Sequence, residues 1–205
     1  IFSHYEKEFY ERFKKIIPIS KNIQIDFMDG KFVKPKSVKI EQIPNLKNYK
    51  NNFEAHLMIK DPKRYIKKLK EKGFKKIIFH LESISPKATL AEINKHQLIG
   101  YIAINPETEL ENIYPFLSNV SGILFMGVHP GKEHQEFVDK VYKKIETLRG
   151  INKKIKIQVD GGANKETIAK LAKLGVNYIN SGSYISESKD PKGTLKELNS
   201  IYVKN

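Results

Sequence analysis

Short apolar segments rich in Ile, Val and Phe recur along the chain, and amphipathic segments with a helical period separate them. Runs of this kind are typical of buried strands, and their alternation with helices predicts a series of parallel βα units. The expected strands are, in chain order, 23–28, 53–58, 76–81, 99–104, 122–128, 155–160 and 177–182. Two helices are expected at 62–73 and 165–175, each ended by a glycine, with Asn164 as the N-cap of the second.

Seven expected strands and an opening segment that already turns into a helix best fit an α/β fold of the (β/α)₈ TIM barrel class. The first strand would then be largely missing from this chain. No Pro/Gly/Ser-rich linker divides the 205 residues, so we expect residues 1–205 to form a single domain. A doubly wound sheet is the alternative, but no G-x-G-x-x-G follows any expected strand, which disfavours it.

The net charge of +14 comes almost entirely from lysines that are interleaved with glutamate along the chain. Arginine clusters, aromatic platforms and zinc-finger spacings are missing, so we expect solvated helix faces and no nucleic-acid partner. A cationic surface also favours small anionic substrates such as phosphate esters. The chain has no cysteine, no signal-like segment and no apolar run near 18 residues, so we expect a cytoplasmic protein without a membrane partner. A homo-oligomer remains possible.

Polar residues stand where several of the expected strands end, which is the functional face of this barrel class. Asp26, His56 and Asp160 occupy such positions, and Gln24 lies on the same strand face as Asp26 because side chains alternate with period two. Two carboxylates and an imidazole could hold a divalent metal, and two opposed carboxylates could perform acid/base chemistry. Each residue alone also fits a structural role, as a core histidine or a helix-capping aspartate.

Two further sets of residues point to the same face of the fold. The chain has only three methionines, Met28, Met58 and Met126, and all stand at the ends of expected strands, where they could line the reaction centre or simply fill the core. Glycine-containing turns follow the last two strands and suggest a phosphate held by backbone N–H groups. These turns could equally be tight βα connections. The candidate phosphate or substrate residues are Gly131, Gly161, Gly162, Gly182 and Ser183.

With these residues in place, the chain resembles the ribulose-phosphate 3-epimerase family. The resemblance follows the family's order over nearly the whole chain. Its matching stretches are IDFMDGKFV (25–33), EAHLMIKDPKRYI (54–66), IIFHLE (77–82), AINPET (103–108), MGVHPG (126–131), IQVDGGANKETI (157–168) and GSYI (182–185).

The resemblance implies a sugar-phosphate 3-epimerase that interconverts D-ribulose 5-phosphate and D-xylulose 5-phosphate, as in the pentose phosphate pathway. Asp26 and Asp160 match the two family aspartates that remove and return the proton at C3 from opposite faces. A divalent metal (Zn-like, or Fe, Mn or Co) would stabilise the enediolate. The resemblance implies Asp26, His56 and Asp160 as its ligands.

Two departures from the family pattern bear on activity. Gln24 stands where the family has a second histidine ligand, and an amide oxygen is a poorer ligand for zinc-like ions than an imidazole. Gln24 could coordinate weakly, hydrogen-bond to Asp26, or mark a site that has lost its metal. The segment GKEHQEF (131–137) replaces the family's glycine-rich phosphate loop, where Lys132 could attract a phosphate and Glu133 would repel it.

These departures keep other functions open. A barrel that binds a phosphorylated sugar without catalysis, or with altered specificity, is the main alternative. A decarboxylase or aldolase resembling the orotidine-phosphate decarboxylase group is disfavoured, because Met28 stands where that group has lysine two residues after aspartate.

Overall fold

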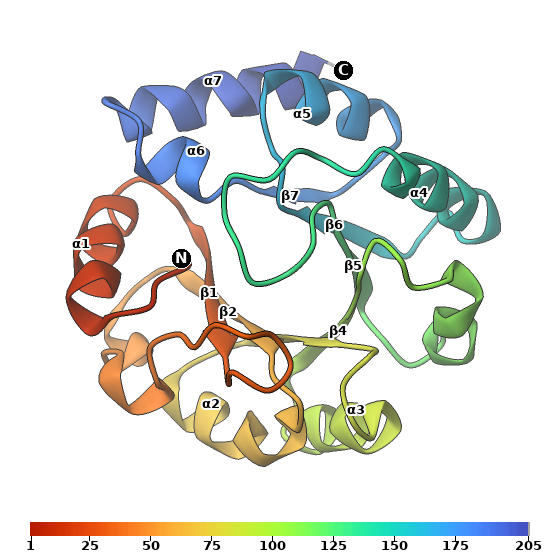
Figure 1. Cartoon of the computed structure of the whole chain (residues 1–205), viewed down its shortest axis with the longest axis horizontal. Helices are drawn as coiled ribbons and strands as arrows, with labels where there is room; N and C mark the ends of the chain where they lie inside the picture. The colour runs from red at the N-terminus through yellow and green to blue at the C-terminus, as the bar shows by residue number, and fades with distance from the viewer. Residues whose placement is uncertain (205) are drawn as a thin grey trace. The chain divides into compact units, whose positions relative to one another are not determined.

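The computed structural model describes residues 1–204 and contains two compact units, residues 1–102 and the chain from residue 103 onward. In the first unit, strands and helices alternate as expected, with short 3₁₀ turns between some of them (Figure 1). Its elements are α1 (Glu6–Ile16), β1 (Asn22–Met28), η1 (Ile40–Gln42), η2 (Leu46–Asn48), β2 (Asn52–Met58), η3 (Pro62–Tyr65), α2 (Ile66–Lys72), β3 (Lys76–His80) and α3 (Pro86–Lys95). Strand β4 (Ile99–Ile104) crosses the boundary between the units.

The second unit continues the same strand–helix alternation. Its elements are η4 (Leu110–Phe116), β5 (Gly122–Met126), α4 (Lys140–Ile151), β6 (Lys156–Asp160), α5 (Lys165–Lys173), β7 (Tyr178–Asn180), α6 (Ser183–Ser186) and α7 (Pro191–Lys204). Within the units, β1 pairs with β2, β2 with β3, β5 with β6 and β6 with β7, and each of these pairs is parallel. The predicted parallel βα repeat is therefore confirmed.

Strand β1 shows how the sequence pattern positions polar groups. Ile23, Ile25 and Phe27 are buried, and the Phe27 ring packs edge-on against Phe74 with 5.8 Å between ring centroids. Because side chains alternate across a strand, the intervening residues Gln24 and Asp26 are directed to the opposite face. The apolar face therefore anchors the strand, and this packing fixes the direction of its polar side chains.

The two expected helices are confirmed with one correction. Residues 62–73 do not form a single α-helix: Pro62–Tyr65 is a 3₁₀ turn, and α2 begins only at Ile66. The tighter turn is common at a helix N-terminus, and Asp61 makes no side-chain cap hydrogen bond that would favour a regular first turn. Gly73 ends α2 with φ +108°, as expected. Asn164 caps α5 by accepting hydrogen bonds from the N–H groups of Glu166 and Thr167.

Several strands are also shorter than expected. Strand β5 ends at Met126 rather than at residue 128, and β7 covers only Tyr178–Asn180. At the start of β7 the backbone N–H of Asn177 donates to the oxygen of Ile157 at 2.8 Å, but the N–H of Ile157 is accepted by the Asn177 side chain at 2.9 Å rather than by a backbone oxygen. Among the described residues, no helix combines the length and apolar character needed to cross a membrane. The single domain and the cytoplasmic location stay predictions.

Candidate functional site

In the first unit, the polar strand ends meet on neighbouring strands. Asp26 of β1 and His56 of β2 are register partners, and both are buried, with 8% and 1% of their surface exposed. Asp26 Oδ1 lies 3.1 Å from His56 Nδ1. Two of the predicted metal-ligating side chains therefore face each other directly.

A line of contacts extends from Asp26 to the end of β3. His56 Nε2 lies 3.0 Å from Nε2 of His80, and Nδ1 of His80 lies 3.3 Å from Oε2 of Glu82. The His80 side chain is fully buried, whereas the Glu82 side chain retains 25% of its exposure. Two imidazoles thus connect a buried carboxylate with a partly exposed one.

Gln24 lies beside the first contact of this line. Its Nε2 donates to Asp26 Oδ1 at 2.8 Å and lies 3.4 Å from His56 Nδ1. Of the three roles expected for Gln24, the hydrogen bond to Asp26 is confirmed. In this orientation the amide presents its NH₂ group to Asp26, so it would have to turn to offer its oxygen to a metal ion.

The three contacts along this line need more protons than two neutral imidazoles carry. Each contact joins two atoms with lone pairs and needs one shared proton, whereas neutral His56 and His80 bring only two N–H groups. The NH₂ group of Gln24 covers a lone pair of Asp26 Oδ1. When His56 is protonated at Nε2, a cation between Asp26 Oδ1 and His56 Nδ1 would be bound by lone pairs of both atoms, so this pair fits a metal site.

Asp29 has the turn-forming role that its position suggests. Its Oδ1 accepts hydrogen bonds from the N–H groups of Lys31 and Phe32, and its Oδ2 accepts one from the N–H of Lys60. Burial alone would raise the pKa of Asp29, but these backbone hydrogen bonds outweigh burial and lower the pKa below its ordinary value. Asp29 therefore ties the loops that follow β1 and β2 together.

All three methionines are the last residues of their strands, as expected. Met28 and Met58 are register partners at the ends of β1 and β2, and Met126 ends β5. Each is at least 95% buried. Both core filling and lining of a reaction centre are compatible with this placement, so their contact with substrate stays a prediction.

In the second unit, Asp160 ends β6 and is the register partner of Met126. Its backbone oxygen accepts a hydrogen bond from Gly127 N–H at 2.7 Å, which ties it to the end of β5. Beneath it on the same strand, the buried Gln158 donates to Asn180 Oδ1 at 2.9 Å. Asp160 therefore stands at a well-anchored strand end, and its action together with Asp26 stays a prediction.

The glycines after β6 have clear structural reasons. Gly161 and Gly162 have φ values of +94° and +68°, and a Cβ on Gly162 would come within 2.9 Å of the Phe137 backbone. These glycines therefore allow a tight turn and a close approach of the loop that follows β5. Gly131 also has positive φ, whereas Gly182 and Ser183 stand at the start of α6. Phosphate binding by these residues stays a prediction.

The loop 131–137 brings charge to this region of the second unit. The side chain of Gln135 holds the loop by donating to the backbone oxygens of His129 and Lys132. Glu133 lies close to Gly182, since a Cβ atom added to Gly182 would lie 3.8 Å from Glu133 Oε1. His134 Nε2 lies 3.6 Å from Oε1 of Glu187. A carboxylate thus lies near one of the predicted phosphate-binding glycines.

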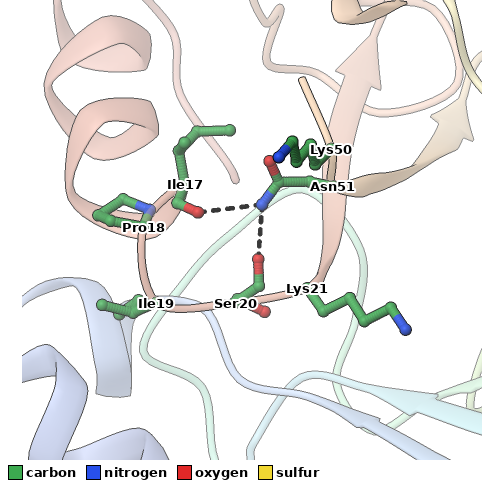
Figure 2. A pocket seen from close by; sticks show the side chains of 7 residues that line it. All are labelled: Ile17, Pro18, Ile19, Ser20, Lys21, Lys50 and Asn51. Carbon is green, nitrogen blue, oxygen red and sulfur yellow. Dashed lines mark hydrogen bonds between the residues drawn. The ribbon is translucent and has the colours of Figure 1, made fainter.

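A cavity of about 310 Å³ lies elsewhere, at the amino ends of the strands (Figure 2). Its lining comes from the segments before β1 and β2. The amide of Asn51 closes part of it by donating to the backbone oxygens of Ile17 and Ser20 at 3.0 and 2.7 Å. The lining residues are Ile17, Pro18, Ile19, Ser20, Lys21, Lys50 and Asn51. The cavity contains none of the predicted site residues.

His80 and Glu82 lie in the matching stretch IIFHLE (77–82), but the sequence predicted no role for them. The H-x-E spacing that follows an apolar strand was the available signal. The distance between two imidazoles on neighbouring strands cannot be read from that spacing.

Comparison with known proteins gives a consistent result. A sequence model described as the ribulose-phosphate 3 epimerase family matches residues 2–186. A ribulose-phosphate 3-epimerase from Schizosaccharomyces pombe is 29% identical over 188 residues, which covers 89% of this chain and 82% of the relative. The enzyme of that name from Helicobacter pylori is 30% identical, with 87% and 85% covered.

Solved structures support the fold class. The crystal structure of 3-hexulose-6-phosphate synthase from Salmonella typhimurium matches with a TM-score of 0.74 at 14% identity, covering 97% of this chain and 94% of that protein. At this identity the likeness shows the fold alone. Together with the seven strands that alternate with helices among residues 1–204, it confirms the predicted (β/α)₈ barrel class, with one strand fewer than eight in this described part.

Proposed function

The chain belongs to the ribulose-phosphate 3-epimerase family, and from this membership we propose that it is an isomerase that inverts C3 of a ketopentose phosphate. The substrate pair proposed is D-ribulose 5-phosphate and D-xylulose 5-phosphate. Curated relatives that carry the name ribulose-phosphate 3-epimerase, and the alignment over most of the chain, support this assignment.

Asp26 and Asp160 are the proposed acid and base. One carboxylate accepts the C3 proton from one face of the substrate, and the other donates a proton to the opposite face, so the configuration inverts. Their positions at the ends of β1 and β6 support this role, because active sites of this fold class lie at the carboxyl ends of strands. Asp26 is held in place by Gln24 and His56, which gives it a defined direction.

A divalent metal is the proposed cofactor, with Asp26, His56 and Asp160 as ligands and Gln24 as a weak fourth ligand once its amide has turned. The observation that carries this proposal is the 3.1 Å approach of Asp26 Oδ1 to His56 Nδ1, which brings two candidate ligand atoms together. When bound, the ion would polarise the C2 carbonyl and stabilise negative charge on the enediolate oxygens. The protein residues would orient the substrate and move the protons.

The glycines 131, 161, 162 and 182 and Ser183 are the proposed phosphate-binding residues, and the three methionines are proposed to cover the reacting carbon. The positive φ values after β6 support phosphate binding, since turns of this kind can direct successive N–H groups to an anion. The buried position of each methionine at a strand end supports its place over the reacting carbon.

Metal analysis of the purified protein, combined with an epimerase assay, tests this proposal. Chelator-treated protein should lose the conversion of ribulose 5-phosphate to xylulose 5-phosphate. Added Zn²⁺, Fe²⁺, Mn²⁺ or Co²⁺ should restore it. Full activity in protein shown to be free of metal would refute the metal-dependent mechanism.

A second candidate function is phosphosugar binding without catalysis or with altered specificity. Glu133 beside Gly182 and the amide of Gln24 in contact with Asp26 favour it, because both change the chemistry expected at the site. Saturable binding of ribulose 5-phosphate without turnover in any of the four metals would support this candidate over the first.

A further inference from the structure

We propose that Phe137 is a positioning residue that holds the turn formed by Gly161 and Gly162, after β6, in the conformation that receives the substrate phosphate. The consequence for the phosphate rests on the proposed function. The inference about the turn rests only on contacts within the second unit.

The ring of Phe137 lies against the end of β5. A Cβ atom added to Gly127 would lie 2.6 Å from Phe137 Cε2 and 2.7 Å from Phe137 Cδ2, and it would also overlap the backbone oxygen of Gly161. The φ angle of Gly127 is not positive, so space rather than backbone conformation requires glycine there. The missing side chain of Gly127 therefore lets the Phe137 ring and the Gly161 oxygen approach the same point.

The backbone of Phe137 lies against the second glycine of the turn. A Cβ atom added to Gly162 would lie 2.9 Å from both Cα and Cβ of Phe137 and 3.1 Å from its nitrogen. Phe137 thus contacts Gly127 with its ring and Gly162 with its backbone. A single residue occupies the space between the end of β5 and the turn after β6.

Backbone hydrogen bonds and ring stacking hold Phe137 in this place. Val138 N–H donates to the oxygen of Gly127 at 2.8 Å, and Gly127 N–H donates to the oxygen of Asp160 at 2.7 Å. The segment that contains Phe137 is therefore connected, through the end of β5, to the last residue of β6. The Phe137 ring also stacks on Tyr142 of α4, with 4.6 Å between the ring centroids.

Helix α5 provides a second support for the same turn. The hydroxyl of Thr167 donates to the backbone oxygen of Gly162 at 3.0 Å. Thr167 therefore fixes the carbonyl group of Gly162, whereas the packing of Phe137 fixes the position of its Cα atom.

The turn needs such supports because it consists of glycines. Two successive glycines have access to a wide range of backbone conformations, so their sequence alone does not fix the direction of their N–H groups. A turn that is ordered before binding costs less conformational entropy when an anion binds to it. Loss of the Phe137 ring should therefore weaken phosphate binding by loosening the turn.

Three variants test this role. Phe137→Ala removes the ring, and Phe137→Leu keeps an apolar side chain in the same space. Tyr114→Ala is the matched control, because it removes a partly exposed aromatic ring of η4, in the same unit, that takes no part in these contacts. The measurements are kcat and KM for ribulose 5-phosphate, the dissociation constant of inorganic phosphate, and hydrogen exchange of the Gly127 and Val138 amides. Urea unfolding verifies that each variant is folded.

We expect faster exchange of both amides in Phe137→Ala. KM and the dissociation constant of phosphate should rise about tenfold, as for loss of a hydrogen bond to a charged group, and kcat should fall by a smaller factor. Phe137→Leu should retain most of the binding, and Tyr114→Ala should behave like the unchanged protein. A role in folding alone would lower kcat, through loss of folded protein, and leave KM unchanged.

Unchanged amide exchange in Phe137→Ala, an unchanged KM and phosphate affinity, or an equal rise of KM in Tyr114→Ala would each overturn the inference. The proposed function can fail separately. If amide exchange accelerates in Phe137→Ala but the unchanged protein neither binds phosphate nor converts ribulose 5-phosphate, Phe137 still positions the turn and the proposed phosphate site is wrong.

Discussion

The carboxamide of Gln24 donates to Asp26 Oδ1 at 2.8 Å, and its nitrogen lies 3.4 Å from His56 Nδ1. A neutral donor thus lies against the two atoms proposed to bind a cation. Metal binding would have to displace these hydrogen bonds, which lowers the affinity below that of a site whose ligands all face the ion.

Replacing Gln24 by histidine should therefore strengthen metal binding. In Gln24→His the side chain offers an imidazole nitrogen, which binds Zn²⁺ better than an amide oxygen, and it no longer holds Asp26 with an NH₂ group. We expect Zn²⁺ affinity to rise about tenfold, by analogy with the effect of optimising groups around a metal. Titration against a chelator measures it, with Gln24→Ala as the control for loss of the amide alone. Equal affinities of Gln24→His and the unchanged protein would contradict a role for this position in metal binding.

Glu133 is expected to weaken the binding of phosphorylated substrates. Its carboxylate lies beside Gly182, one of the residues proposed to hold the phosphate. One pair of like charges about 4 Å apart in water costs about 1 kcal/mol, so Glu133→Gln should lower KM for ribulose 5-phosphate roughly fivefold and leave kcat nearly unchanged. The exposed Glu136, in the same loop, provides the control Glu136→Gln. If both variants lower KM equally, the effect belongs to net charge and the specific role of Glu133 is wrong.

Asp29 should make stability depend on pH. Its folded pKa lies below the ordinary value, because backbone N–H groups favour the carboxylate. The stabilisation is therefore fully present above the unfolded pKa of about 3.9 and is lost as pH falls through the lower folded pKa.

Asp29→Asn should lower the free energy of unfolding by about 1 kcal/mol at pH 7, and the difference from the unchanged protein should shrink below pH 4. Urea unfolding at several pH values measures this. Asp139→Asn is the control, because Asp139 precedes α4 without a side-chain cap hydrogen bond. A difference that stays constant down to pH 2 would contradict the account of Asp29.

Glu54 and Lys76 form a pair whose disruption should destabilise the first unit. They are register partners on β2 and β3, their charged atoms are 2.8 Å apart, and their side chains are only 15% and 13% exposed. Lys76 Nζ also lies 3.7 Å from the centre of the Tyr101 ring. Burial lowers the pKa of Lys76, and Glu54 opposes this effect without cancelling it.

Glu54→Gln leaves the buried ammonium of Lys76 without its carboxylate and should cost about 3 kcal/mol, the lower end of the range for breaking a buried pair. Replacing both residues, as Glu54→Leu with Lys76→Met, should recover most of the loss. Thermal and urea unfolding measure both variants. A double variant as unstable as Glu54→Gln alone would mean that packing, rather than the unpaired charge, dominates.

The strands could be predicted from the sequence because their cores are continuous runs such as Ile77–Phe79, which are buried on both faces. Asp26 and His56 could be expected at the same ends of neighbouring strands, because side chains alternate with period two and the strands are parallel, but the register that makes them direct partners is known only from the structure. The 3₁₀ turn that begins at Pro62 could not be predicted, because the local sequence pattern does not distinguish it from the first turn of an α-helix. The contact between His56 and His80 could not be predicted either, since it depends on the directions of side chains on two strands and on the packing of Phe32.

The central claim is that Asp26 and Asp160 exchange the proton at C3, and solvent isotope exchange tests it most directly. The unchanged protein, incubated in D₂O with ribulose 5-phosphate and Zn²⁺, Fe²⁺, Mn²⁺ or Co²⁺, should incorporate deuterium at C3, as measured by mass spectrometry and NMR. Asp26→Asn and Asp160→Asn should each reduce incorporation to background, whereas Asp61→Asn, at the start of η3, should exchange normally. Undiminished exchange in both Asp26→Asn and Asp160→Asn would contradict the two-aspartate mechanism.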